Sequence, residues 1–282
     1  MTRSWIVVPA AGIACGAIAF VSRSPGEAVA IALTGAALAA AVRAFAGPSS
    51  AASASAVIAA LIGALALLAV PGLLVRAPLA AAAAAFAIAE LVRPAPPEAS
   101  PWPAIGAATV AGMLDPSFVA LIAISGWKLL RRTRPRYTAL VPAAGVIASA
   151  LAVAAAVRWP PLWTAWADHP PHALDALHTA ALVGDALGPI AAVAAIAGLG
   201  IGATRGRYGL AAMTGVAAGS ALVCVRCDVL SPAVLAVGAL ATGIAIARLA
   251  ALVRVPSGQV VVGVTAGLVA VASPALVIYS SM

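Results

Sequence analysis

The chain has 282 residues, of which 64% are hydrophobic and 9% are charged, and its formal net charge is +8 at pH 7. A water-soluble domain cannot bury so much apolar surface, so the composition excludes an ordinary soluble protein. Apolar runs of around twenty residues favour membrane-spanning helices over a β-barrel. The sequence therefore predicts an all-α, polytopic integral membrane protein that forms a single domain over residues 1–282.

The apolar runs, taken in chain order, predict about ten transmembrane helices. These runs cover residues 5–22, 27–46, 52–75, 77–93, 103–127, 137–157, 179–203, 208–225, 230–250 and 258–280. The first run follows Arg3 and also resembles a signal sequence or a first span whose N-terminus lies inside. No clear small-x-small cleavage site follows it, so we interpret it as a span, with its direction left open. No segment between the runs is long and polar enough for a soluble domain.

A basic segment at residues 128–136 carries five Lys and Arg residues between the fifth and sixth predicted spans. Such a cluster stays in the cytoplasm because moving it across the membrane is costly. If each span crosses once, the inside also holds Arg23, Arg76, Arg205, Arg207, Arg248 and Arg254, and the outside holds Arg3, Arg43, Arg93, Arg158 and Arg226. The sequence thus predicts a cytoplasmic loop at 128–136, an external loop at 158–178 and both termini outside a bacterial inner membrane. We interpret the positive charge as a topology signal and a contact with membrane lipids, with no role for nucleic acid.

The fifth predicted span contains Asp115-Pro116 and is bracketed by Trp102 and Trp127, as by an aromatic belt at each interface. Proline removes a backbone donor and pushes the preceding residue out of helical geometry, so a break is expected here. An acid at this depth is costly and is a functional, even catalytic, candidate. In the alternative interpretation, Asp115 caps a half-helix that begins at Pro116.

The external loop 158–178 contains tryptophans at positions 159, 163 and 166, a spacing that places them on one face of a helix. The pattern favours a short helix that anchors the chain in the interface. Alternatively, Trp163 and Trp166 form a stacking platform for a sugar or a lipid head group. Arg158 and Arg226 are then the external cations that would hold a phosphate.

The same loop holds the candidate general bases Asp168 and Asp175 and a candidate site for a divalent metal. His172, Asp175 and His178 are spaced three apart, so on a helix they would line neighbouring turns. Cys224 and Cys227 are candidates for further ligands, but a Cys-x-x-Cys outside the cytoplasm is also a candidate disulfide. A wet loop tolerates His and Asp freely, so both alternatives stay open.

Two glycine pairs, Gly184 with Gly188 and Gly215 with Gly219, have the spacing that brings membrane helices together. Such pairs arise readily by chance in a chain rich in Ala and Gly. No nucleotide-binding or HExxH motif occurs, and neither do the acidic motifs that hold magnesium pyrophosphates.

The region Ala54–Leu140 resembles the middle of the bacterial GT-C glycosyltransferases, particularly the large polytopic ones similar to protein O-mannosyltransferases. It has two Ala- and Leu-rich spans, a proline-rich break at 94–101, a span in which Ala111-Gly112-Met113-Leu114 precedes the polar pair Asp115-Pro116, a basic loop and a further span. In that family an external loop after the first span carries a catalytic acid. Here the corresponding link, 22–27, is too short and is predicted inside. The resemblance therefore implies a reduced relative in which no residue inherits the catalytic role.

Three functional hypotheses follow. The first is a GT-C-like protein that acts on or beside a lipid-linked sugar at the outer face. The second is a small-molecule transporter with a five-plus-five inverted repeat and broken spans at Asp115-Pro116 and at Ser231-Pro232 or Ser273-Pro274. The third is a non-catalytic subunit that associates with other membrane subunits. A cavity that receives an acid favours the first, a pseudo-two-fold relation between the halves favours the second, and a fixed partner favours the third.

Overall fold

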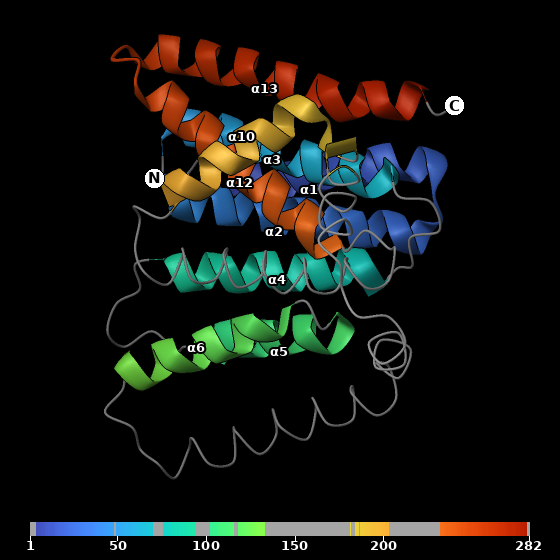
Figure 1. Ribbon diagram of the computed structural model, residues 1–282, viewed down its shortest axis with the longest axis vertical. Helices are drawn as coiled ribbons and strands as arrows, with labels where there is room; N and C mark the ends of the chain where they lie inside the picture. Colours follow the sequence, from blue (N-terminus) through green and yellow to red (C-terminus); the bar gives the residue numbers. More distant parts are fainter. Residues whose placement is uncertain are drawn as a thin grey trace.

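The computed structural model describes residues 4–47, 49–69, 76–93, 102–115, 118–132, 181, 184–185, 187–202 and 232–280. Within these ranges the chain is almost entirely α-helical and contains no strand, which confirms the all-α prediction for the part of the chain that is described. The helices, shown in Figure 1, are α1 (Ser4–Ser22), α2 (Pro25–Ala46), α3 (Ser50–Ala69), α4 (Arg76–Val92), α5 (Trp102–Leu114), α6 (Val119–Arg132), α10 (Pro189–Gly202), α12 (Pro232–Ala251) and α13 (Pro256–Ser280).

Helix α2 is the centre of the N-terminal half and packs against α1, α3 and α4. A capping box fixes its first turn: Ser24 Oγ accepts the N–H of Glu27 at 3.4 Å, and Glu27 Oε2 accepts the N–H of Ser24 at 3.1 Å. Pro25 at the first helical position has the backbone angle that a helix start requires. The helix ends at Gly47, whose φ of 86° lies in the region that favours glycine. These caps make α1, α2 and α3 successive antiparallel helices with short links.

The C-terminal helices α12 and α13 pack against α3, and α12 also contacts α2 and α4, while α13 lies at one outer edge of the bundle in Figure 1. Gly243 of α12 lies against Ser55 and Ala59, while Ala239 lies beside Gly63, so α12 runs antiparallel to α3. The buried Thr242 joins α12 to α10, because its hydroxyl lies 2.9 Å from the carbonyl oxygen of Ala191. Helix α13 turns back after α12 and packs against α3, α10 and α12.

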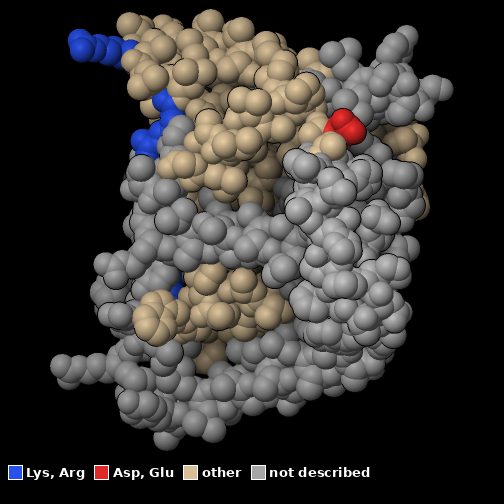
Figure 2. All heavy atoms as spheres, in the orientation of Figure 1, with Lys and Arg blue, Asp and Glu red and all other residues tan. Residues whose placement is uncertain are grey.

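These directions place most of the described basic residues at one end of the bundle, which we name the basic end. It holds Arg43, Arg93, Lys128, Arg131, Arg132, Arg248 and Arg254, whereas Arg23 and Arg76 lie at the opposite end. The guanidinium of Arg23 marks that opposite end, since it donates to the carbonyl of Leu68 at the close of α3 at 3.0 Å. In the view of Figure 2, the Lys and Arg atoms, in blue, lie toward the left edge, and the Asp and Glu atoms, in red, lie toward the right.

Two described helices, Pro25–Ala46 and Ser50–Leu68, are long and apolar enough to cross a membrane by length and composition. Both are largely buried inside the bundle, with 61% and 67% of their most apolar windows covered by protein. The other apolar helices among the described residues have apolar stretches of 10–17 residues, shorter than these two.

The predicted single span at 103–127 is wrong, because the chain forms two helices there. Helix α5 ends at Leu114, α6 begins at Val119, and the two helices pack against each other. At the turn, Gly112 faces Val119 and Ile122. The chain thus folds back on itself, and we name residues 102–132 the α5–α6 hairpin (Figure 1).

Close helix approach at Gly198 gives a test of the packing. A Cβ atom on Gly198 would lie 1.8 Å from the carbonyl oxygen of Ala241, which is backbone of α12. We expect Gly198→Ala to lower the free energy of unfolding by about 1–3 kcal/mol, the usual cost of overpacking. Thermal unfolding in mild detergent measures this change.

Gly200→Ala is the matched control, since Gly200 lies on the same helix and, among the described residues, no atom lies within 4 Å of its would-be Cβ. Alanine there should be neutral or stabilising, because it raises helix propensity without a clash. Equal effects of the two variants would contradict the tight contact between α10 and α12.

Candidate functional site

The helix break at Asp115 is the feature of the described chain that most resembles a functional site. The N–H of Asp115 donates to the carbonyl of Ala111 at 2.9 Å, and the N–H of Phe118 donates to the carbonyl of Asp115 at 3.1 Å. Asp115 therefore closes α5 and also leads into α6, and it is half-buried. The fully buried Phe118 anchors the return of the chain. The prediction of a break at this position is confirmed.

Lys128 holds the far end of the hairpin against α4. Its side chain is only 8% exposed, and its ammonium donates to the carbonyl of Glu90 at 3.0 Å and to the carbonyl of Leu91. These carbonyls belong to the last turn of α4, where no helical N–H remains to bond them. The negative end of the helix dipole also lies there, so a buried cation is favourable. Backbone carbonyls at the negative end of the α4 dipole thus stabilise the charge of Lys128.

The last turn of α4 has a second polar contact on its outer side. Arg93 and Glu90 form an ion pair at 2.7 Å, in which the arginine side chain is 52% exposed and the glutamate 20% exposed. An exposed pair of this kind adds little stability, because water and salt screen it. The buried lysine therefore matters more than the surface pair for the position of the hairpin.

The Lys128 contact corrects the predicted placement of Arg93 and Trp102 relative to the basic segment. A single span at 103–127 would place Arg93 and Trp102 at the outer end of the span, and Trp127 and Lys128 at the inner end. Because Lys128 touches the C-terminal turn of α4, the end of α4 and the end of α6 lie together. A single span was predicted at 103–127 because two short apolar helices together have the composition and total length of one span.

Most of the predicted site residues lie outside the described residues. This is so for the catalytic candidates Asp168 and Asp175, the binding candidates Arg158, Trp163, Trp166 and Arg226, the metal candidates His172 and His178, and the pair Cys224 and Cys227. Their roles stay predictions. Among the residues that the structure describes, no group of three His, Cys, Asp or Glu side chains is placed to hold a metal ion.

Sequence reasoning missed the role of Lys128, although it singled out the segment in which the lysine lies. Lys128 follows Ser125 by three residues, and both are buried, at 8% and 2% exposure. This spacing places them on one face of α6. The sequence signal was therefore present: a lysine on the same helical face as a small polar residue, one turn before the arginines.

The comparisons with known proteins give no family assignment, since no protein-family model, curated protein or solved structure matches the chain. The site is thus defined by its own geometry. That geometry consists of a helix break with an acid, a hairpin folded at this break, and a lysine that fixes the open end of the hairpin to α4.

The Lys128 contact predicts a specific loss of stability. Lys128→Met keeps a long side chain but removes the donors, which leaves the last carbonyls of α4 without this partner. We expect the free energy of unfolding in mild detergent to fall by about 1–3 kcal/mol. Amide exchange should rise along α5 and α6 more than along α2.

Ser125→Ala is the matched control on the same face of α6. Within the described chain the Ser125 hydroxyl is buried with no hydrogen-bond partner, so its removal should be nearly neutral or stabilising. If Lys128→Met destabilises the protein no more than Ser125→Ala, the contact does not hold the hairpin.

Proposed function

We propose that the chain is a multi-pass protein of the bacterial inner membrane, with the basic end in the cytoplasm. The outward faces of its helices support this proposal. Ile13 and Phe20 of α1 are 72% and 65% exposed, and Leu268 of α13 is 65% exposed. A surface helix of a soluble protein turns a polar face to water, whereas α1, α3, α10 and α13 contain no charged residue. Lipid is the solvent that such faces fit.

The charge distribution supports the direction of insertion. Cytoplasmic ends of membrane proteins carry an excess of Lys and Arg, and the basic end carries this excess here. In this orientation the first helix begins in the cytoplasm, and the basic segment 128–136 stays cytoplasmic. Helix α10 starts at the other end, so the predicted loop 158–178 stays external.

The α5–α6 hairpin is too short to cross the membrane. Helix α5 has 13 residues and α6 has 14, so each is about 20 Å long, whereas the hydrocarbon core is about 30 Å thick. We propose that the hairpin enters from the cytoplasmic side, turns at Asp115 and returns. With the predicted spans 137–157 and 208–225, the chain then has roughly nine crossings and one re-entrant hairpin.

Solute transport is the molecular role that this arrangement supports best. Backbone breaks at membrane depth occur where they are enclosed by protein or line a path for a solute. Asp115 would lie about 20 Å from the cytoplasmic interface, judged from the length of α5. An acid at this depth is a candidate proton carrier. The observation that carries the proposal is the fold-back of two helices at a carboxylate.

The lipid-linked sugar hypothesis is a second proposal, and one observation favours it. Helix α6 ends at the basic end and α10 begins at the opposite end, so the loop that holds Asp168 and Asp175 stays external, as that hypothesis requires. The hairpin departs from the single span in the resemblance over Ala54–Leu140, however. Roughly nine crossings also do not divide into the five-plus-five repeat expected for a transporter, so transport rests on the hairpin alone.

Cysteine labelling tests the membrane placement. In a background with Cys15, Cys224 and Cys227 replaced by alanine, single cysteines are introduced as Arg93→Cys, Arg254→Cys and Gly26→Cys. A membrane-impermeant maleimide should label the first two only from the cytoplasmic side, and the third only from outside. Vesicles of both orientations give the comparison.

The single-span alternative predicts a different labelling pattern. With one crossing at 103–127, Arg93→Cys and Arg254→Cys would react from opposite sides, and Gly26→Cys would react together with Arg254→Cys. If the impermeant maleimide labels all three positions equally in vesicles of both orientations, the chain does not cross the membrane. That result would overturn the membrane proposal itself.

Reconstituted liposomes test the molecular role. With the dye pyranine inside, the wild-type protein should raise proton flux under a pH gradient, and Asp115→Asn should lower that flux by about tenfold. Glu90→Gln is the control, since it neutralises an acid at the surface of the basic end. The proton fluxes of the two variants are compared only if their unfolding temperatures are equal.

Transfer of sugar from a polyprenyl phosphate is measured in the same liposomes with Asp168→Asn and Asp175→Asn. Transfer by the wild-type protein that these variants abolish, together with proton flux that is indifferent to Asp115→Asn, would reverse the order of the two proposals. Neither activity in wild-type liposomes would contradict both.

A further inference from the structure

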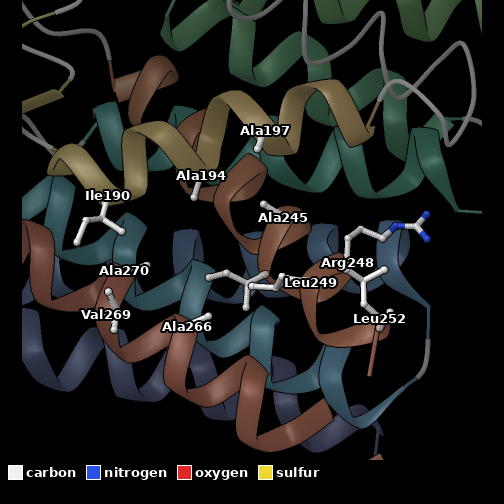
Figure 3. A pocket seen from close by; sticks show the side chains of 12 residues that line it. Ile190, Ala194, Ala197, Ala245, Arg248, Leu249, Leu252, Ala266, Val269 and Ala270 are labelled. Carbon is white, nitrogen blue, oxygen red and sulfur yellow. The ribbon is translucent and has the colours of Figure 1, made fainter. Parts of the chain in front are cut away.

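An apolar groove runs between α10, α12 and α13. Its volume is about 770 Å³, within the range of small-molecule sites. Figure 3 shows side chains from the three helices around it: Ile190, Ala194, Ala197, Ala245, Arg248, Leu249, Leu252, Ala266, Val269 and Ala270. Arg248 is the only charged residue among the lining residues that the structure describes. The groove is therefore a hydrocarbon surface with one cation.

The sequence explains why the groove is hollow. Helices α10 and α12 approach closely at Gly198 and at Thr242, where a carbonyl and a hydroxyl meet. Next to this contact, the walls are built largely from alanines, which are too short to fill the space between α10, α12 and α13. Leu249 and Val269, which are 49% and 48% exposed, form its open side. In the membrane this side opens toward the lipid.

The cation lies at one end of the groove. Arg248 is in the last turn of α12, at the basic end, and Figure 3 shows its guanidinium at the edge, directed away from the apolar side chains. The exposed Arg254 follows in the link to α13. An apolar trough that ends at arginines matches a molecule with a hydrocarbon chain and an anionic head. Arginine suits phosphate in particular, because its planar fork donates two parallel hydrogen bonds.

We propose that this groove binds an anionic phospholipid of the cytoplasmic leaflet, with one acyl chain along α10 and α13 and the phosphate at Arg248. The site rests on the membrane placement proposed above and goes beyond transport, since nothing in the α5–α6 hairpin lines it. Charge complementarity selects the occupant: a second copy of the chain would bring its own basic end beside Arg248. In a zwitterionic lipid such as phosphatidylcholine, the quaternary ammonium of the head group offsets the attraction between its phosphate and the cation.

Native mass spectrometry of the full chain in mild detergent tests the site. The protein is titrated with phosphatidylglycerol and with phosphatidylcholine that carry identical acyl chains. We expect the first bound lipid to be phosphatidylglycerol, and Arg248→Gln to weaken its binding by about tenfold, equivalent to about 1.4 kcal/mol. Arg93→Gln is the matched control, because Arg93 lies at the same end of the bundle but outside the groove.

Filling the groove is the second arm. Ala266→Phe should remove binding of the first lipid, and Ala194→Leu serves in its place if the phenylalanine variant does not fold. Equal binding of the two lipids, binding indifferent to both substitutions, or a dimer that occupies the groove without lipid would each overturn the proposal. If labelling has placed the chain in the membrane as proposed, such a result removes the lipid site alone.

Discussion

The position of the α5–α6 hairpin depends on one buried ammonium group. The ammonium of Lys128 donates hydrogen bonds to the last carbonyls of α4. This contact brings the end of α6 back to the end of the bundle at which α5 begins. A charge at 8% exposure is costly unless its donors are bonded, and the open turn of a helix supplies acceptors and a favourable dipole together.

The helices and the break at Asp115 could be predicted from the sequence. The direction in which α6 runs after the break could not. Asp115-Pro116 forbids a regular helix by local geometry, so this feature is visible in two adjacent residues. The fold-back is not local, since it depends on a lysine and on the carbonyls of residues almost forty positions earlier. Composition cannot show such a contact, because α5 and α6 are as apolar as the halves of a single span. The same holds for the groove, which requires three helices from separate parts of the chain.

Small residues explain the close packing, although the spacing of glycine pairs did not identify which ones matter. Among the described residues, no atom lies within 4 Å of the would-be Cβ of Gly184, so no helix contact of the predicted pair is seen at that glycine within this part of the chain. Gly198 and Gly243, in contrast, lie directly against backbone of neighbouring helices. In a chain rich in alanine, close approach is set by which face of each helix is buried. That face is decided by partners distant in sequence.

The hairpin also resolves a weakness in the charge pattern. With a single span at 103–127, Arg43 and Arg93 fall on the side opposite the basic segment, where they oppose the expected asymmetry. With the chain folded back, both join Lys128, Arg248 and Arg254 at one end, and only Arg23 and Arg76 lie at the other end among the described basic residues. The Lys128 contact and the charge bias are independent observations, one of hydrogen bonds and the other of composition. Their agreement is the strongest argument that α5 begins and α6 ends at the same end of the bundle.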